Sequence, residues 1–149
     1  MKVPRDHAQA LLDKAANDFV AARATLATGK ALDTVCFHAQ QAAEKSLKAV
    51  LALHDVEYPW RHDLSELLEL AKPRLLSLAA YEDRLSGLTP FAVEIRYDTE
   101  FEPSLEQATE ALRTATEIYD LVRARVEAAG TGQPPDSAPT GVESSGSSQ

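Results

Sequence analysis

Apolar side chains recur along most of the chain at steps of three and four residues, which places them on one face of an α-helix. The pattern predicts a first helix from Pro4 to Gly29, because proline is favoured at the first helical position and glycine just after the last. Its apolar stripe is Leu11, Leu12, Ala15, Phe19, Ala22 and Leu26. A second helix is expected over residues 32–54, with Asp33 as a candidate N-cap.

Shorter helices are expected in the middle of the chain. The turn at Tyr58-Pro59-Trp60 ends the second helix, and His62-Asp63 opens a short one, with Asp63 as its N-cap. The apolar face of this short helix is Leu64, Leu67, Leu68 and Ala71. Pro73 interrupts it, and a further short helix is expected over residues 75–85.

The segment over residues 86–103 is the least regular, because it holds a glycine and two prolines. Residues 92–95 have strand propensity, but a lone strand has no partner here. We therefore expect a loop or a helical turn in this segment.

The last helix is expected from Ser104 to Ala129. Its apolar positions repeat at alternating steps of three and four: Leu105, Ala108, Leu112, Ala115, Tyr119, Val122 and Val126. Such a seam packs on another helix, most simply an antiparallel neighbour. Residues 130–149 are rich in Gly, Pro and Ser and are expected to be a disordered tail, because they cannot bury enough apolar surface to offset their chain entropy. The domain boundaries predicted are therefore 1–129 and 130–149.

Charge and composition narrow the classes of function. The net charge of −8 excludes a broad basic surface for nucleic acid, so any anion site must be local. The single cysteine, Cys36, excludes an intramolecular disulfide and a CxxC metal pair. No run approaches the roughly 18 apolar residues of a membrane span, and no apolar signal segment follows the start. We expect a cytoplasmic protein that does not contact a membrane.

One face of the second helix carries a line of hydrogen-bond donors. His38, Gln41, Lys45 and Lys48 fall within an arc of roughly 80°, opposite an apolar stripe. That stripe is Val35, Cys36, Ala39, Ala43, Leu47, Val50 and Leu53. Imidazole, amide and ammonium groups suit a phosphate or the edge of a nucleobase. The alternative is an ordinary solvated helix face, which carries the same residue types.

The residues of this helix also resemble a known family. Residues 37–49, FHAQQAAEKSLKA, are similar to the signature helix of HEPN domains. His62-Asp63-Leu64 and residues 92–97, AVEIRY, resemble the other two recurring segments of that family, in the same order. The resemblance covers residues 5–128, and the helix signature is the specific part of it.

The resemblance implies an all-α fold, an up-and-down bundle of about four or five helices followed here by the disordered tail. It also implies a homodimer and a partner, a minimal nucleotidyltransferase, with which many HEPN proteins form toxin–antitoxin pairs. The resulting hypothesis is a module that binds this partner and a nucleotide or RNA. Its candidate ligand-binding residues are His38, Gln41, Lys45, Lys48, His62, Arg96 and Tyr97.

Ribonuclease activity is the alternative hypothesis. Catalytic members of the HEPN family carry an arginine that is followed, after about four to six further residues, by a histidine. The arginine supplies a cation for the phosphate, and the histidine supplies a base for the ribose hydroxyl. No arginine has that spacing before His7, His38, His54 or His62, so no catalytic residue is assigned. A non-standard site could still form if His38, His62 and Arg96 met in space. Each has a structural alternative: packing for His38, helix capping for His62 and an ion pair for Arg96.

Other chemistries find no support in the sequence. The His and Cys spacings of metal sites and the Gly-rich loop of phosphate sites are absent, so no metal and no cofactor are expected. Cys36 lies on the apolar side of its helix and is expected to be a packed thiol rather than a nucleophile. A structural dimer without a ligand is the third hypothesis.

Overall fold

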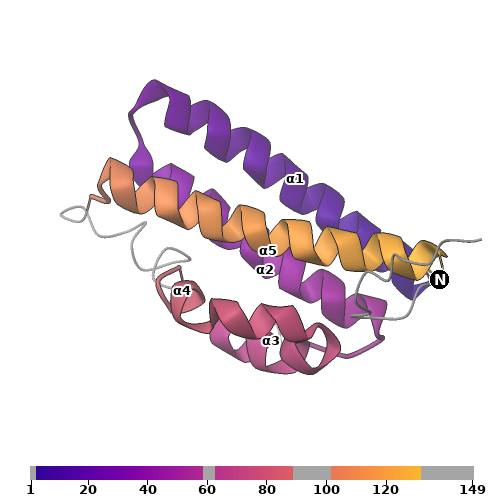
Figure 1. The fold of residues 1–149 in the computed structure, drawn as a ribbon. Helices are drawn as coiled ribbons and strands as arrows, with labels where there is room; N and C mark the ends of the chain where they lie inside the picture. The colour runs from indigo at the N-terminus through magenta and orange to yellow at the C-terminus, as the bar shows by residue number, and fades with distance from the viewer. Residues whose placement is uncertain (1–2, 59–62, 89–101, 132–149) are drawn as a thin grey trace, which may run out of the picture.

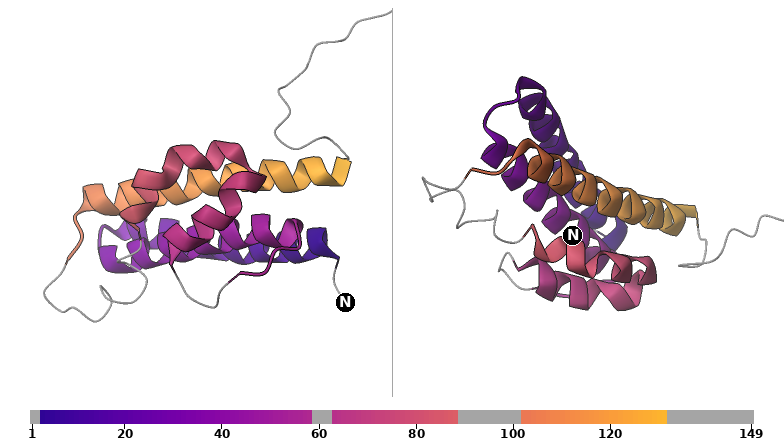
Figure 2. Two further views of the ribbon diagram at one scale, coloured as in Figure 1. Left: turned by 90° about the horizontal axis from the view of Figure 1, so that it is seen from below. Right: turned by 60° about the vertical axis from the view of Figure 1, so that its left-hand side comes forward.

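The computed structural model describes residues 3–58, 63–88 and 102–131, and within them the fold is all-helical, as the sequence predicted. Three long helices form the body of the bundle (Figure 1): α1 (Pro4–Thr28), α2 (Leu32–Leu53) and α5 (Leu105–Thr131). The shorter elements are α3 (Leu64–Ala71), the 3₁₀ helices η1 (Lys72–Arg74) and η2 (Leu76–Tyr81), and α4 (Glu82–Ser86). They connect α2 to α5 on one side of the bundle (Figures 1 and 2).

The direction of the long helices is set by the short ones. In Figures 1 and 2, α1 runs antiparallel to both α2 and α5. Helices α2 and α5 run in the same direction, because the α3–α4 segment between them returns the chain toward the end of the bundle where α2 begins. Two contacts fix α1 on α5: the rings of Phe19 and Tyr119 lie 5.1 Å apart, and Arg5 Nε donates to the Val126 carbonyl at 3.3 Å. The start of α1 therefore lies beside the end of α5.

Local signals set most helix ends. Gly29 ends α1 with a left-handed φ of 71°, a conformation that glycine adopts without strain. The Asp63 carboxylate caps α3 by accepting from the backbone of Ser65 and Glu66, as predicted. At the start of α5, Gln107 N–H donates to Ser104 Oγ, and the Gln107 side chain accepts from Ser104 N–H. This reciprocal pair is a capping box.

The prediction that Asp33 caps the second helix is wrong. The N-cap of α2 is Ala31, whose backbone is left-handed at φ 54°, and no side chain caps this end. Asp33 lies inside the first turn, where its carboxylate accepts from Thr34 N–H at 2.9 Å.

The single helix predicted over residues 75–85 is also wrong, because it is divided into η2 and α4. Leu75 is extended, with φ −150°, and separates η2 from η1. Leu75, Leu78 and Tyr81 are three residues apart, so a helix of about three residues per turn aligns them on the core. In an α-helix, each would be offset from the one before by roughly 60° around the axis.

Helix α2 is the centre of the core. It packs on α1, α5 and α3, and its predicted apolar stripe is buried up to Val50, while Leu53 is partly exposed. Burial extends well beyond that stripe, to Gln40, Ala42, Glu44, Ser46, Ala49, Leu51 and Ala52. The sequence predicted one apolar stripe with a polar face opposite, but only a narrow strip of α2 reaches solvent. The reason is that three elements surround it, so its burial does not follow its own hydrophobicity alone.

The seam of the last helix is confirmed except at Leu105, which is 56% exposed. The antiparallel neighbour expected for it is wrong for its main contact, because α5 packs chiefly on α2, which runs in the same direction, and less on the antiparallel α1. The helix ends at Thr131 rather than at Ala129. The predictions for residues 92–95 and for the tail beyond Thr131 lie outside the described residues. None of the helices described is long and apolar enough to cross a membrane.

Candidate functional site

Asp18 of α1 joins two of the candidate residues on α2. Its carboxylate is buried, with the whole residue 7% exposed. His38 Nδ1 lies 2.8 Å from Asp18 Oδ1, and Lys45 Nζ lies 2.6 Å from Asp18 Oδ2. Because a carboxylate only accepts, His38 is held with Nδ1–H toward Asp18. The interaction fixes the position of both candidate side chains against α1.

A second polar chain runs along α2 itself. Gln41 donates to the Gln40 side chain at 2.7 Å, and Gln40 donates to Glu44 at 3.4 Å. Lys48 Nζ then lies 2.8 Å from Glu44 Oε2. Gln40 and Glu44 are buried, so this chain satisfies polar groups that would otherwise be costly in the core.

Three of the predicted residues meet at one pocket. It has a volume of about 700 Å³ and lies between the start of α1 and the second half of α2, bounded by the turn that follows α2. Its lining is His7, Leu11, Gln41, Glu44, Lys45, Lys48, Ala52, Asp55, Val56, Glu57 and Tyr58. Lys48 Nζ lies 5.4 Å from the centre of the Tyr58 ring. Ammonium, amide and aromatic groups therefore share one cavity, which we call the α1–α2 pocket.

The α1–α2 pocket can accept a group that is both anionic and aromatic. Each ammonium carries three donors, and the contacts with Asp18 and Glu44 use only part of them. The Tyr58 ring offers a surface on which a base can stack. Glu44, Asp55 and Glu57 also line the pocket, so its charge is mixed rather than strongly positive. A phosphate would therefore be gripped by particular ammonium groups and not by a broad field.

The structure brings together part of the predicted site. Gln41, Lys45 and Lys48 line the α1–α2 pocket. His38 lies further toward the start of α2, outside the lining, and is joined to Lys45 through Asp18. The other three candidates, His62, Arg96 and Tyr97, lie outside the described residues.

The sequence interpretation missed Asp18, Tyr58 and His7. A signal for Asp18 was present, because it falls three residues after Ala15 and directly before Phe19, on the apolar stripe of α1. A carboxylate on a buried stripe needs a partner from another element. Tyr58 and His7 carried no such signal, because they come together only when the start of α1 packs beside the end of α2.

Cys36 is a packed thiol, as predicted. It has no exposed surface, and burial together with the nearby Asp33 carboxylate raises its pKa to about 12. A thiol in that state is not a nucleophile at neutral pH. Across the described ranges, no three His, Cys, Asp or Glu side chains lie close enough to hold a metal ion.

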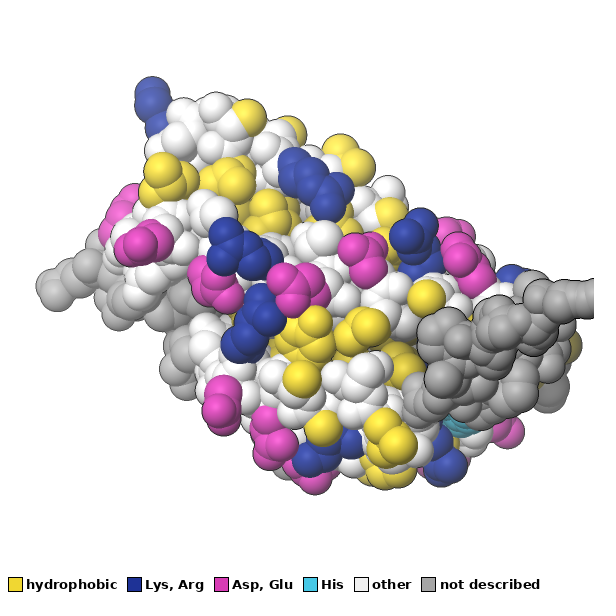
Figure 3. Space-filling view, in the orientation of Figure 1, with side chains coloured by type: hydrophobic (Ala, Val, Ile, Leu, Met, Phe, Trp, Pro, Cys, Tyr) yellow, Lys and Arg dark blue, Asp and Glu magenta, His cyan; other side chains and the backbone are white. Residues whose placement is uncertain are grey.

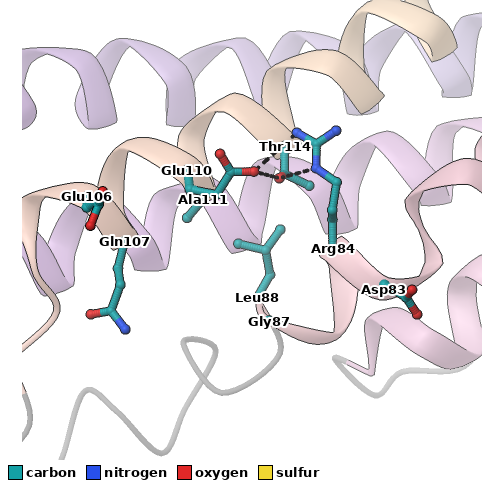
Figure 4. Close-up of a pocket in the computed structure, with 9 residues that line it drawn as sticks. All are labelled: Asp83, Arg84, Gly87, Leu88, Glu106, Gln107, Glu110, Ala111 and Thr114. Carbon is teal, nitrogen blue, oxygen red and sulfur yellow. Dashed lines mark hydrogen bonds and ion pairs between the residues drawn. The ribbon is translucent and has the colours of Figure 1, made fainter.

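A second pocket of about 430 Å³ lies between α4 and α5 (Figure 4). Arg84 projects from α4 to α5, where it contacts Thr114 at 3.2 Å and Glu117 at 2.9 Å. Hydrogen bonds from Arg84 and then Tyr81 lower the pKa of Glu117. Among the described residues that line this cavity, three carry carboxylates, Asp83, Glu106 and Glu110, and the cation Arg84 is already paired. The polar groups of the described lining chiefly hold α4 on α5.

The face drawn in Figure 3 supports a local rather than an extended site. On the face drawn in Figure 3, basic and acidic side chains alternate, and apolar groups lie between them. This distribution agrees with the net charge of −8. A long nucleic acid would find no continuous basic track on this face.

Comparisons with known proteins identify relatives of the fold. The family model described as "HEPN domain" matches residues 8–125. The chain is also similar to the crystal structure of ST0689, an archaeal HEPN homologue, with a TM-score of 0.66 and 25% sequence identity. That match covers 85% of this chain and 99% of the archaeal one. No curated protein sequence matches the chain significantly.

Proposed function

Because this chain belongs to the HEPN domain family, we propose that it acts as a binding and interaction module in a two-component, toxin–antitoxin-like complex with a minimal nucleotidyltransferase. In this proposal, the α1–α2 pocket holds a nucleotide, either free or at the end of an RNA. The chain acts as a cytoplasmic homodimer, and the chemistry of the complex belongs to the partner.

One observation carries this proposal. Gln41, Lys45 and Lys48, chosen from the sequence as nucleotide contacts, open into a single cavity that also contains Tyr58. The lysines supply donors for phosphate, and the tyrosine supplies a stacking surface. Its volume of about 700 Å³ falls within the range of small-molecule sites, roughly 300–1,000 Å³.

Nucleotide binding is tested by calorimetric titration of the full chain with ATP, with Lys48→Gln and Tyr58→Ala as variants. Each should weaken binding about tenfold, which corresponds to about 1.4 kcal/mol. Lys30→Gln is the control, because Lys30 is an exposed lysine of the turn between α1 and α2, outside the pocket lining, and its loss changes the net charge equally. Equal affinity of all four proteins would contradict a nucleotide site in the α1–α2 pocket.

The partner is tested separately. The chain should co-purify with a nucleotidyltransferase encoded beside it, and sedimentation should report a homodimer for the chain alone. Absence of any association between the two purified proteins would remove the interaction part of the proposal. The nucleotide titration would still test the nucleotide-binding part of the proposal.

Ribonuclease activity is a second candidate, and the Asp18–His38 contact favours it. Asp18 holds His38 through Nδ1, and no hydrogen bond reaches His38 Nε2 from the described part of the chain. Such an imidazole can take the proton of a ribose 2′-hydroxyl as that oxygen attacks the adjacent phosphorus and the 5′-oxygen leaves. RNA cleavage without added metal should then be lost in His38→Ala. Intact RNA after incubation with the folded wild-type chain would exclude this candidate.

A further inference from the structure

Two carboxylates that line the α1–α2 pocket are not engaged by the protein. Glu44 lies 2.8 Å from Lys48 Nζ, but Asp55 and Glu57 form no ion pair and no side-chain hydrogen bond among the residues that the structure describes. An ionised carboxylate only accepts hydrogen bonds. The cavity therefore combines lysine donors with unused acceptors, so a phosphate group alone does not match all of its polar groups.

The basic and acidic groups lie at different ends of this pocket. Lys45 and Lys48 are on the second half of α2, whereas Asp55 and Glu57 belong to the turn that follows the helix. Lys48 and Asp55 are seven residues apart, about two helical turns, which corresponds to roughly 10 Å along the axis. The chain then folds back, and the centre of the Tyr58 ring is 5.4 Å from Lys48 Nζ. A ligand that is anionic at one end, aromatic, and rich in N–H donors at the other end fits this order.

The backbone holds Asp55 in a defined position. Asp55 N–H donates to the Ala52 carbonyl at 3.1 Å, and Val56 N–H donates to the Leu51 carbonyl at 2.8 Å. This pair of hydrogen bonds is a Schellman motif, with Asp55 at the left-handed position, φ 57°, that glycine usually occupies. Glu57 follows the motif and has a longer side chain with more rotamers. Of the two unused carboxylates, Asp55 is therefore the better placed for a directional contact.

We propose that the α1–α2 pocket selects a guanine nucleotide and that Asp55 determines this preference. The inference rests on the nucleotide site of the proposed function and adds the identity of the base. The Asp55 carboxylate accepts hydrogen bonds from N1–H and the N2 amino group of guanine. The base stacks on Tyr58, and Lys45 and Lys48 donate to the phosphates.

Guanine is the base whose edge matches a carboxylate. Its Watson–Crick edge places two N–H donors side by side, and the two carboxylate oxygens accept one each. Adenine and cytosine have an acceptor nitrogen beside their amino group, and uracil has a carbonyl on either side of its single N–H. Those acceptors would face a carboxylate oxygen with no proton between them, and a site built for donors rejects a ligand that lacks them.

Calorimetric titration of the full chain with GTP and with ATP tests the preference. GTP should bind at least about tenfold more tightly, as expected for a bidentate contact to a base edge. Inosine triphosphate keeps N1–H but lacks the N2 amino group, so its affinity should fall between the two. The wild type should reject xanthosine triphosphate, because xanthine has a carbonyl in place of that amino group.

Three variants assign the preference to Asp55. Asp55→Asn presents one donor and one acceptor, so it should lose about tenfold in GTP affinity and gain binding of xanthosine triphosphate, a gain that a folding defect does not produce. Asp55→Gly suits the left-handed backbone and should fold, and it should bind GTP and ATP equally. Glu57→Gln is the matched control, because it removes the same charge from the same lining and should keep the GTP preference.

The outcomes separate this inference from the proposed function. Equal affinity of the wild type for GTP and ATP would overturn the role of Asp55 and leave the nucleotide site intact, as would an unchanged preference in Asp55→Asn. Loss of the preference in Glu57→Gln as well as in Asp55→Gly would attribute it to total charge and contradict base recognition by Asp55. Failure of all four nucleotides to bind would overturn both proposals.

Discussion

At the scale of single residues, two buried charged groups have opposite environments. Asp18 is fully engaged, with one oxygen toward His38 and the other toward Lys45. Arg125 has a neutral imidazole as its hydrogen-bond partner and an unsatisfied Nε. The first links α1 to α2, and the second links α5 to the end of α2. Both charges lie on buried helix faces, where the three- and four-residue spacing of the sequence predicts apolar side chains.

Substitution of Asp18 tests the link between α1 and α2. Asp18→Asn turns an amide N–H₂ toward one of two donors, so the free energy of unfolding should fall by about 1–3 kcal/mol. Asp13→Asn is the matched control, because Asp13 is an exposed acid of the same helix. Its effect should stay within about 0.5 kcal/mol. Urea unfolding measures both, and equal losses in the two variants would show that the Asp18 contacts contribute nothing.

His54 predicts a pH dependence of stability. Its pKa in the folded chain lies below its ordinary value of 6.5, first through burial and then through Arg125 and Arg74. As pH falls below that ordinary value, the unfolded chain takes up a proton while folded His54 stays neutral. Stability should therefore be lost as pH falls from 6.5 toward the lowered folded pKa.

The His54→Gln variant isolates this effect, because glutamine keeps an acceptor for Arg125 but does not titrate. Its urea midpoint should depend less on pH than that of the wild type between neutral and mildly acidic conditions. Asn17→Gln, at an exposed position on α1 whose side chain does not titrate, is the control and should keep the wild-type slope. Parallel curves for His54→Gln and wild type would refute the assignment.

At the scale of elements, short polar motifs decide where helices begin. Asp63 and Ser104 each accept backbone N–H groups at the first turn of α3 and α5. The start of α2 has no such side chain and relies on the left-handed Ala31. Tertiary packing on α1 and α5 therefore holds this end of α2. The N-cap preference of aspartate, taken alone, led to the wrong prediction of Asp33 as the cap.

Substitution of Ser104 tests how much the N-terminal cap of α5 contributes to the stability of the fold. Ser104→Ala deletes the hydroxyl that accepts from Gln107 N–H, and stability should fall by about 1 kcal/mol. Thr109→Ala, within the same helix, is the control, and it should be neutral or slightly stabilising because alanine has the higher helix propensity. The comparison uses thermal unfolding followed by circular dichroism. A loss in Thr109→Ala as large as that in Ser104→Ala would mean that the cap has no special role.

At the scale of the whole molecule, α2 is enclosed by α1, α5 and α3. Small side chains allow this close approach, and they are Ala39, Ala42, Ala43, Ala49 and Ala52, all buried. The polar strip that remains outside the core is narrow, and it opens into the α1–α2 pocket. The candidate site therefore lies on the helix that α1, α5 and α3 enclose, which suits a preorganised contact.

Enlargement of a central alanine tests this arrangement. Ala43→Leu inserts a side chain where α2 has no free space, so stability should fall by about 1–3 kcal/mol or more. Ala24→Leu, on the exposed face of α1, adds the same atoms and should be nearly neutral. Guanidinium unfolding measures the two variants. Tolerance of leucine at both positions would show that the core around α2 is loosely packed.

The sequence by itself determined the helices, most of their ends and the family. Periodicity, Gly29, Asp63 and the run over residues 37–49 are local signals, and local signals are read directly from the order of residues. It also placed Gln41, Lys45 and Lys48 on one face of α2, because residues three and four apart share a helix face.

Only the tertiary structure decided which side chains meet across elements. Asp18 reaches α2, Tyr58 closes the α1–α2 pocket, and Arg125 reaches His54 from α5. These contacts join positions separated by many residues, and helix periodicity carries no information about distances of that kind. The burial of α2 has the same cause, since it depends on how many neighbours surround a helix and not on its own pattern.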